Sequence, residues 1–172
     1  ITEVVALAGY DVTMRDVETE FVNEGYENIE WSLQKLHESG RLEELPDEVL
    51  ARIETTVDLE AVVSDADLVI EAAPEDLDLK REIFADLYEY APDGAILASN
   101  TSSLPITDIA AATDRPESVV GTHFFNPPVK MDLVEVIYGE RTSEETAETA
   151  QAFVESIDKT PIYVRKDVHG FV

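Results

Sequence analysis

A histidine and a glutamate are the residues of this sequence best suited to acid–base chemistry. His123 lies in one apolar run, residues 119–125, and Glu135 lies in a second, residues 133–137. Between the runs stands the segment Asn126-Pro127-Pro128. Proline fixes its own φ and cannot donate to a sheet ladder, so this segment is expected to be rigid. The pattern predicts two strands joined by a rigid connection.

Glu135 needs a partner if its strand is buried. Side chains alternate across a strand, so Glu135 shares a face with Leu133 and Ile137, where an unpaired carboxylate would be costly to bury. His123 is the nearest candidate partner in the sequence. An imidazole bound to a carboxylate is held in one tautomer, as a general base requires. From these two residues alone, a catalytic dyad and a structural pair both remain open.

Polar segments follow two further strands that the sequence predicts to be buried. Residues 67–71 are almost continuously apolar, as strands of a parallel sheet are, and they run into Ala72-Ala73-Pro74-Glu75. Such a loop, at the carboxyl end of a strand, is where open α/β sheets bind ligands. A second buried strand, residues 95–99, opens into Asn100-Thr101-Ser102-Ser103. This segment also has a plainer interpretation, in which Ser103 or Thr107 caps the next helix.

Hydrophobic periodicity and turn residues divide the whole chain into helices and strands. Helices are predicted at residues 1–9, 17–37, 47–53, 59–63, 76–90, 106–112 and 143–156. Strands are predicted at residues 10–16, 55–57, 67–71, 95–99, 119–125, 133–137 and 159–164. In the helix at 17–37, the residues expected to face inward are Phe21, Ile29, Leu33 and Leu36.

The first residues have the form of half a dinucleotide-binding unit. A helix ending at Gly9 and a strand ending in Asp16 are the second half of such a βαβ unit. The sequence contains no G-x-G-x-x-G loop, which would hold the pyrophosphate at a helix N-terminus. We therefore expect an α/β, Rossmann-like, doubly wound fold with a mostly parallel sheet, truncated so that its first strand is missing.

Four segments together resemble one enzyme family. H-F-F-N-P-P (123–128), M-D-L-V-E-V (131–136), N-T-S-S-L (100–104) and E-A-A-P-E (71–75) are similar to the signature of the L-3-hydroxyacyl-CoA dehydrogenases, and the resemblance covers nearly the whole chain. It implies an NAD-binding Rossmann-type domain over residues 1–166. Residues 167–172 would begin the linker to a helical C-terminal domain, absent here, through which the family forms homodimers.

The cofactor that the resemblance implies is NAD. Asp16 would hydrogen-bond the adenosine ribose hydroxyls, although a solvated acid after a strand is the alternative. Glu75 and Lys80 would contact the ribose and nicotinamide side, and Asn100 would lie close to the nicotinamide. Without the resemblance, Lys80 would be interpreted as a lysine on the surface of its helix.

The reaction that the resemblance implies is oxidation of an L-3-hydroxyacyl-CoA to the 3-ketoacyl-CoA. His123 would take the hydroxyl proton, and Glu135 would orient the imidazole. Ser102 and Asn126 would hold the substrate oxygen in line with the hydride acceptor. Ser32 matches the serine of the family that contacts the acyl-CoA.

Several alternatives stay open. Ser39 and Arg41 compete for the place of the family's basic CoA contact. The protein could instead oxidise a free sugar acid or hydroxy acid, as an L-gulonate dehydrogenase of the same superfamily does. It could also be a non-catalytic binding or structural relative, as some lens crystallins are. The complete set of His123, Glu135, Ser102 and Asn126 argues against that last interpretation.

Composition restricts the partners and the compartment. The 172 residues include 38 acidic and 12 basic ones, for a net charge of −26, so nucleic acid is not an expected partner. No apolar run is long enough for a membrane span, and neither end resembles a signal peptide, so a cytoplasmic protein is expected. Cysteine is absent, and no metal is expected. The acids, spread along the chain, resemble the surface of a protein from an extreme halophile.

Overall fold

The computed structural model describes residues 1–166, so the expected linker at 167–172 lies outside the described residues. The chain divides into two compact units, Ile1–Val62 and Val63–Val172. Within residues 1–166, no helix is both long enough and apolar enough to cross a bilayer.

The first unit consists of a two-stranded parallel sheet, three helices and all but the last residue of a fourth, α4 (Leu59–Val63). Its elements are α1 (Thr2–Leu7), β1 (Val12–Arg15), α2 (Thr19–Glu38), α3 (Pro46–Leu50) and β2 (Ile53–Thr56). Val12 of β1 lies opposite Ile53 of β2. α1 ends as predicted, because Gly9 adopts a φ of +92° and its N–H donates to the Ala6 carbonyl at 3.0 Å.

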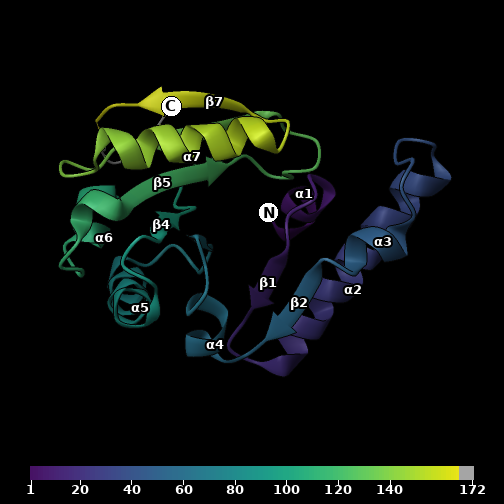
Figure 1. The fold of residues 1–172 in the computed structure, drawn as a ribbon, viewed down its shortest axis with the longest axis horizontal. Coiled ribbons are helices and arrows are strands. Elements are labelled where there is room, and N and C mark those ends of the chain that lie inside the picture. The colour runs from purple at the N-terminus through teal and green to yellow at the C-terminus, as the bar shows by residue number, and fades with distance from the viewer. Residues whose placement is uncertain (167–172) are drawn as a thin grey trace. The chain divides into compact units, whose positions relative to one another are not determined.

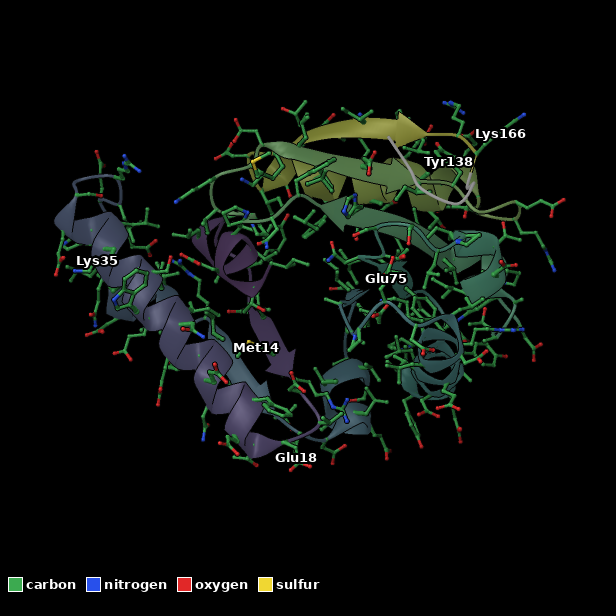
Figure 2. The ribbon with its side chains drawn as sticks, turned by 180° about the vertical axis from the view of Figure 1, so that it is seen from behind. Met14, Glu18, Lys35, Glu75, Tyr138 and Lys166 are labelled. Atoms are coloured by element: carbon green, nitrogen blue, oxygen red, sulfur yellow. The ribbon has the colours of Figure 1, made fainter. Side chains whose placement is uncertain are left out.

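A small apolar core fixes the long helix α2 to the rest of this unit. Figure 1 shows α2 beside α3 and β2. Its buried members are Ala6, Leu33, Val49, Leu50 and Ile53. Met14 belongs to β1 (labelled in Figure 2), and its side chain reaches α2, because a Cβ added to Gly25 would come within 3.3 Å of the Met14 methyl carbon. Glycine inside this helix, which weakens it intrinsically, is therefore explained by close packing.

The second unit contains a five-stranded sheet. After α4 (Leu59–Val63) come β3 (Leu68–Glu71), α5 (Leu77–Tyr90), β4 (Ile96–Ser99), α6 (Ile106–Ala110), a 3₁₀ turn (Pro116–Ser118), β5 (Val119–Phe124), β6 (Leu133–Ile137), α7 (Glu144–Ser156) and β7 (Thr160–Val164). The strands lie in the order β3-β4-β5-β6-β7. Among the described strands, only the pairing of β5 with β6 is antiparallel. The fold is α/β and Rossmann-like, with mostly parallel strands.

Helices pack on this sheet around one tightly fitted strand. α7 packs along β5, β6 and β7, while α6 packs against β5 and α5 (Figure 1). A Cβ added to Gly121 of β5 would lie 2.8 Å from the Ile137 side chain and 2.9 Å from that of Ile106. Glycine at this position therefore lets β5, β6 and α6 pack closely, and this packing positions the C-terminal end of β5.

Some predicted positions in the first unit are wrong. Phe21 does not face inward, because its side chain is 51% exposed, and Val22 is buried instead. The predicted helix at 47–53 is α3, Pro46–Leu50, and Ile53 already belongs to β2. Periodicity in α2 does not tell which side of the helix finds a neighbour, and the short apolar stretch at residues 46–56 does not determine where α3 ends and β2 begins.

The predicted cap of the helix at 106–112 is also wrong. Pro105 is the N-cap residue of α6, which has no side-chain cap. The Ser103 hydroxyl donates to the Glu75 carboxylate, and the Thr107 hydroxyl accepts from the Glu140 N–H. A cap at Ser143 is confirmed, because its hydroxyl accepts from the Thr146 N–H at the start of α7.

Candidate active site

The antiparallel register of β5 and β6 places His123 directly opposite Glu135. Nδ1 of His123 lies 2.6 Å from Oε2 of Glu135. The glutamate side chain is 2% exposed and the histidine side chain 15% exposed. The predicted partnership of the two side chains is thereby confirmed, and the glutamate is the more deeply buried member.

This geometry selects the hydrogen position on the imidazole. An ionised carboxylate can only accept hydrogen bonds, so Nδ1 carries the hydrogen and donates it to Glu135. Nε2 is then the basic nitrogen, and within residues 1–166 it has no hydrogen-bond partner. The ring of Phe125 lies 4.8 Å from the imidazole, centroid to centroid, and restricts the ring further. The arrangement can accept a proton at Nε2 and stabilise the resulting imidazolium.

The polar loop after β4 is held by Glu75. One oxygen of this carboxylate, Oε1, accepts from the Thr101 hydroxyl at 2.7 Å, from the backbone N–H groups of Ser102 and Ser103 at 2.9 Å each, and from the Ser103 hydroxyl at 3.0 Å. Ser102 itself is exposed, and its hydroxyl has no partner within the described residues. The loop thus offers a free hydroxyl on a backbone fixed by a carboxylate.

The hydrogen bonds to Glu75 also affect its pKa. Partial burial raises the pKa of the Glu75 carboxyl, but the hydrogen bonds from Thr101, Ser103 and the backbone outweigh that effect and hold the pKa below its ordinary value. The carboxylate is therefore ionised at neutral pH. Figure 2 labels Glu75, which follows β3 in the loop at residues 72–76.

Behind this loop lies a buried ion pair. Lys80 on α5 is 1% exposed, and its ammonium donates to Glu71 Oε1 at 2.7 Å and to the Ala73 carbonyl at 2.9 Å. The same nitrogen lies 3.9 Å from Glu75 Oε2. The interpretation of Lys80 as a lysine on the surface of its helix is therefore wrong. The second oxygen of Glu71 accepts from the Ser99 hydroxyl at 2.7 Å.

Asn100 joins the polar loop to the strand that carries His123. Its side-chain oxygen accepts from the Phe124 N–H at 2.8 Å, and its own N–H donates to the Glu71 carbonyl at 2.8 Å. Asn126 is exposed, two residues beyond the end of β5, and is linked to Pro127 by a cis peptide bond. The second unit thus brings the ends of β3, β4 and β5 together around one set of polar groups.

Two of the predicted residues lie in the first unit. Asp16 is exposed just after β1, and its Oδ1 accepts from the Val17 N–H at 2.7 Å. The hydroxyl of Ser32 donates to Glu3 Oε1 at 2.6 Å, across from α2 to α1. Burial raises the pKa of the Glu3 carboxyl, although the bond from Ser32 acts in the opposite direction.

Sequence reasoning missed Glu71, Ser99 and Thr101. Glu71 and Ser99 end their strands directly opposite each other in the parallel register, and both are buried. A charged or polar residue that closes an otherwise apolar strand was the available signal. Within residues 1–166, no three histidine or carboxylate side chains are arranged to hold a metal ion.

Known proteins share this sequence and this fold. The NAD-binding domain of 3-hydroxyacyl-CoA dehydrogenase matches residues 1–168. The chain is 45% identical over 172 residues to a protein of Deinococcus radiodurans named "Probable 3-hydroxybutyryl-CoA dehydrogenase", and this covers 100% of the chain and 61% of that protein. The crystal structure of FadB2 from M. tuberculosis superimposes on this structure with a TM-score of 0.95 at 39% sequence identity. The match covers 99% of this chain and 60% of that one.

A third relative has a different substrate in its description. A diketoreductase structure, described as catalysing conversion of dicarbonyl compounds, has a TM-score of 0.93 at 32% identity and covers 99% of this chain and 61% of that one. The chain therefore spans about three fifths of the length of these relatives, 60% to 61%. By sequence and by fold, the chain belongs to the family of NAD-binding domains of 3-hydroxyacyl-CoA dehydrogenases.

Proposed function

We propose that the whole protein catalyses the NAD-dependent oxidation of an L-3-hydroxyacyl-CoA to the 3-ketoacyl-CoA. The observation that carries this proposal is the 2.6 Å contact between His123 and the buried Glu135, which leaves Nε2 as a free base. Family membership supports the choice of substrate class, and the name of the Deinococcus radiodurans relative favours a four-carbon acyl group.

The described residues fit a nicotinamide dinucleotide. Asp16 is exposed with one oxygen bound only locally, which suits the paired hydroxyls of a ribose. Glu75 is 37% exposed, and its Oε2 is 3.9 Å from the nearest cation, so it can accept from a second ribose. We propose these two carboxylates, Lys80 and Asn100 as the cofactor contacts. When bound, NAD supplies the acceptor for the hydride that leaves C3 of the substrate.

In this proposal, side chains of the protein accept the proton of the substrate's 3-hydroxyl group and hold the oxygen of that group in position. His123 Nε2 takes the proton of the 3-hydroxyl as the C3 hydride departs, so that the hydroxyl becomes the ketone. Glu135 stabilises the imidazolium and keeps the ring in place. Ser102, whose hydroxyl has no partner within the described residues, and Asn126 orient the substrate oxygen. Ser32 is proposed as a contact of the acyl-CoA.

The substitution His123→Gln tests the base directly. Glutamine keeps a polar side chain opposite Glu135 but cannot take up the proton, so turnover of acetoacetyl-CoA with NADH should fall by about 10³-fold or more. NADH absorbance, followed in molar potassium chloride, measures the rate. Circular dichroism should show a folded variant, and near-parental activity in that folded variant would remove His123 from the mechanism.

A free hydroxy acid or dicarbonyl compound is the second candidate substrate. The diketoreductase relative, at 32% identity, favours testing it. Turnover of free 3-hydroxybutyrate that equals turnover of its CoA ester would support this alternative. No turnover of either, in a folded protein, would favour a non-catalytic binding role. From the family resemblance we also propose a homodimer in the cytoplasm, which light scattering and cell fractionation would test.

A further inference from the structure

One hydrogen bond does not define the plane of the His123 imidazole. Glu135 holds Nδ1 at 2.6 Å, but the χ2 torsion of histidine has a broad distribution, so the ring can still tilt about that contact. The lone pair of Nε2 lies in the plane of the ring, and a hydrogen bond weakens steeply as its angle departs from linear. A general base in this position therefore needs a second contact that sets its plane.

Phe125 supplies a second contact. It follows β5 directly, and side chains two residues apart in an extended chain lie on the same side. The rings of His123 and Phe125 are 4.8 Å apart between centroids, with an angle of 47° between their planes. Tilted aromatic pairs at such separations attract each other. The imidazole is thus held at one nitrogen by Glu135 and against its ring by Phe125.

The backbone is fixed on both sides of Phe125, so its ring is a firm support. Before it, the Phe124 N–H donates to the side-chain oxygen of Asn100 at 2.8 Å. After it, the Pro127 carbonyl accepts from the Lys130 N–H at 2.9 Å, which folds the connection to β6. The two phenylalanines also differ in burial, because Phe124 is 4% exposed in the core, whereas Phe125 is half-buried.

We infer that Phe125 is a positioning residue, which sets the plane of the His123 ring so that the Nε2 lone pair points at the proton it takes. Within residues 1–166, Glu135 is the only side chain that hydrogen-bonds His123, so no other polar group performs this task. The inference rests on the proposed function, in which Nε2 is the base. Because Phe125 acts through His123, its loss slows the reaction and leaves the binding of substrate and cofactor unchanged.

The substitution Phe125→Leu in the whole protein tests this separation of rate from binding. Leucine keeps an apolar side chain but removes the ring, and kcat for reduction of acetoacetyl-CoA should fall about tenfold. The KM for acetoacetyl-CoA and the Kd for NADH should stay within about twofold of the parental values. A raised KM with parental kcat would mean that Phe125 contacts the substrate itself. That result, or parental values of both constants, would overturn the inference.

A deuterium isotope effect shows which step has slowed. NADH deuterated at the transferred position slows only the step in which hydride and proton move. If the base is misaligned in Phe125→Leu, that step limits kcat, so the isotope effect on kcat should be at least as large as in the parent. An isotope effect that falls toward one would mean that product release or another conformational step has slowed instead, and would contradict a role in positioning the base.

Two further variants separate the ring from a general loss of packing. Phe125→Tyr keeps the ring, and its kcat should stay within about twofold of the parental value. Phe153→Leu is the matched control, because it makes the same change at another half-buried phenylalanine, on α7, and should keep the parental kcat. Equal losses of kcat in Phe125→Tyr and Phe125→Leu, or in Phe153→Leu and Phe125→Leu, would overturn the inference.

Proton NMR tests the ring contact without catalysis. The chain contains three histidines, and the imidazole C–H signals of His123 are those that disappear in His123→Gln. The ring current of Phe125 should displace these signals, so they should move in Phe125→Leu and stay near their parental positions in Phe125→Tyr. Signals that do not move in Phe125→Leu would overturn the inference. A parent that turns over no 3-ketoacyl-CoA would contradict the proposed function, and the NMR comparison would still decide whether Phe125 holds the imidazole.

Discussion

Thr122 carries a polar atom that the fold does not use. Its hydroxyl is fully buried in β5, on the opposite face of the strand from His123, and has no hydrogen-bond partner within the described residues. A buried hydroxyl without a partner costs the free energy of its desolvation, and no hydrogen bond offsets that cost. One residue away from the candidate base, the sheet therefore keeps a local defect.

Replacing that hydroxyl by a methyl group should stabilise the protein. Thr122→Val has nearly the same shape, and we expect the free energy of unfolding to rise by roughly 1 kcal/mol. Chemical denaturation measures it. Thr101→Val is the matched control, because the Thr101 hydroxyl binds Glu75 and the Leu104 N–H, and its loss should destabilise. A decrease in stability for Thr122→Val would mean that the hydroxyl is satisfied.

Two carboxyl groups should give opposite responses to acid. Hydrogen bonds lower the pKa of Glu75 below 4.5, so its stabilisation is complete above pH 4.5 and is lost as pH falls through the lowered value. Burial raises the pKa of Glu3 above 4.5, so its charged form destabilises the fold at neutral pH, and that penalty disappears as pH falls toward 4.5.

Charge-removing variants would make this contrast measurable. Relative to the parent, Glu75→Gln should be less stable at neutral pH, with the difference shrinking below pH 4.5. Glu3→Gln should be more stable at neutral pH, with the difference shrinking as the pH approaches 4.5 from above. Melting curves across this range test both. Parallel curves for the two variants would contradict the assigned directions.

At the level of elements, the side chain of Arg115 caps the C-terminal end of helix α5. The helix runs to Tyr90, and the guanidinium of Arg115 donates to the carbonyl of Ala91 at 3.1 Å and to that of Pro92 at 2.6 Å. The guanidinium also lies 5.4 Å from the ring centroid of Tyr88. A cation at this end complements the helix dipole and satisfies carbonyls that the helix leaves free.

Arg115→Met should lower the free energy of unfolding by about 2–3 kcal/mol, because two charge-assisted hydrogen bonds are lost from a buried place. Arg115→Lys should recover only part of this loss, since one ammonium cannot match the planar fork. Arg81 is exposed on helix α5 and serves as the control. The free energy of unfolding of Arg81→Met should stay within about 0.5 kcal/mol of the parent value. Full recovery by lysine would mean that charge alone matters.

The elements that sequence predicted well are those with strong periodicity or a clear cap. The strands around His123 and Glu135 and the helix after Ser143 were confirmed, because a buried alternation and a capping serine leave little choice. Phe21 was assigned to the core and is exposed, because periodicity alone does not tell which face of a helix finds a neighbour.

The polar groups of the candidate site were predicted only in part. The pairing of His123 with Glu135 followed from burial and strand order, but the network of Glu71, Ser99 and Thr101 did not. Glu71 ends β3, and Ser99 and Thr101 lie at and after the end of β4. The register of these two parallel strands cannot be deduced from the spacing of residues in the sequence. Lys80 looked like a surface residue because no local pattern shows which carboxylate will meet it. Partners across parallel strands are the part that required the structure.

At the scale of the whole molecule, charge is the dominant feature. The net charge is −26, and α2 alone carries Glu20, Glu24 and Glu27 at intervals that place like charges next to each other. Such repulsion is screened within about 3 Å at molar salt and within about 10 Å at 0.1 M. The charge of this chain should therefore oppose folding chiefly in dilute buffer.

The melting temperature should accordingly rise by several degrees between 0.1 M and molar potassium chloride. A variant with Glu20, Glu24 and Glu27 all changed to Gln should show a smaller rise, because it has less repulsion to screen. Thermal unfolding followed by circular dichroism tests both proteins. Equal melting temperatures of the parent in dilute and concentrated salt would contradict the resemblance to halophilic proteins.

The antiparallel pairing of β5 with β6 also sets an order of assembly. His123 and Glu135 are 12 residues apart in sequence, whereas Ser99 and Glu71 are 28 apart and need the α5 crossover between them. Hairpins close within about 1–10 μs, and parallel pairings must wait for a longer loop to order. We expect the acid–base pair to meet early, so in pulsed hydrogen exchange the amides of β5 and β6 should become protected before those of β3. A chain refolding from the denatured state would then bring His123 and Glu135 together before the loops that follow β3 and β4 are in place.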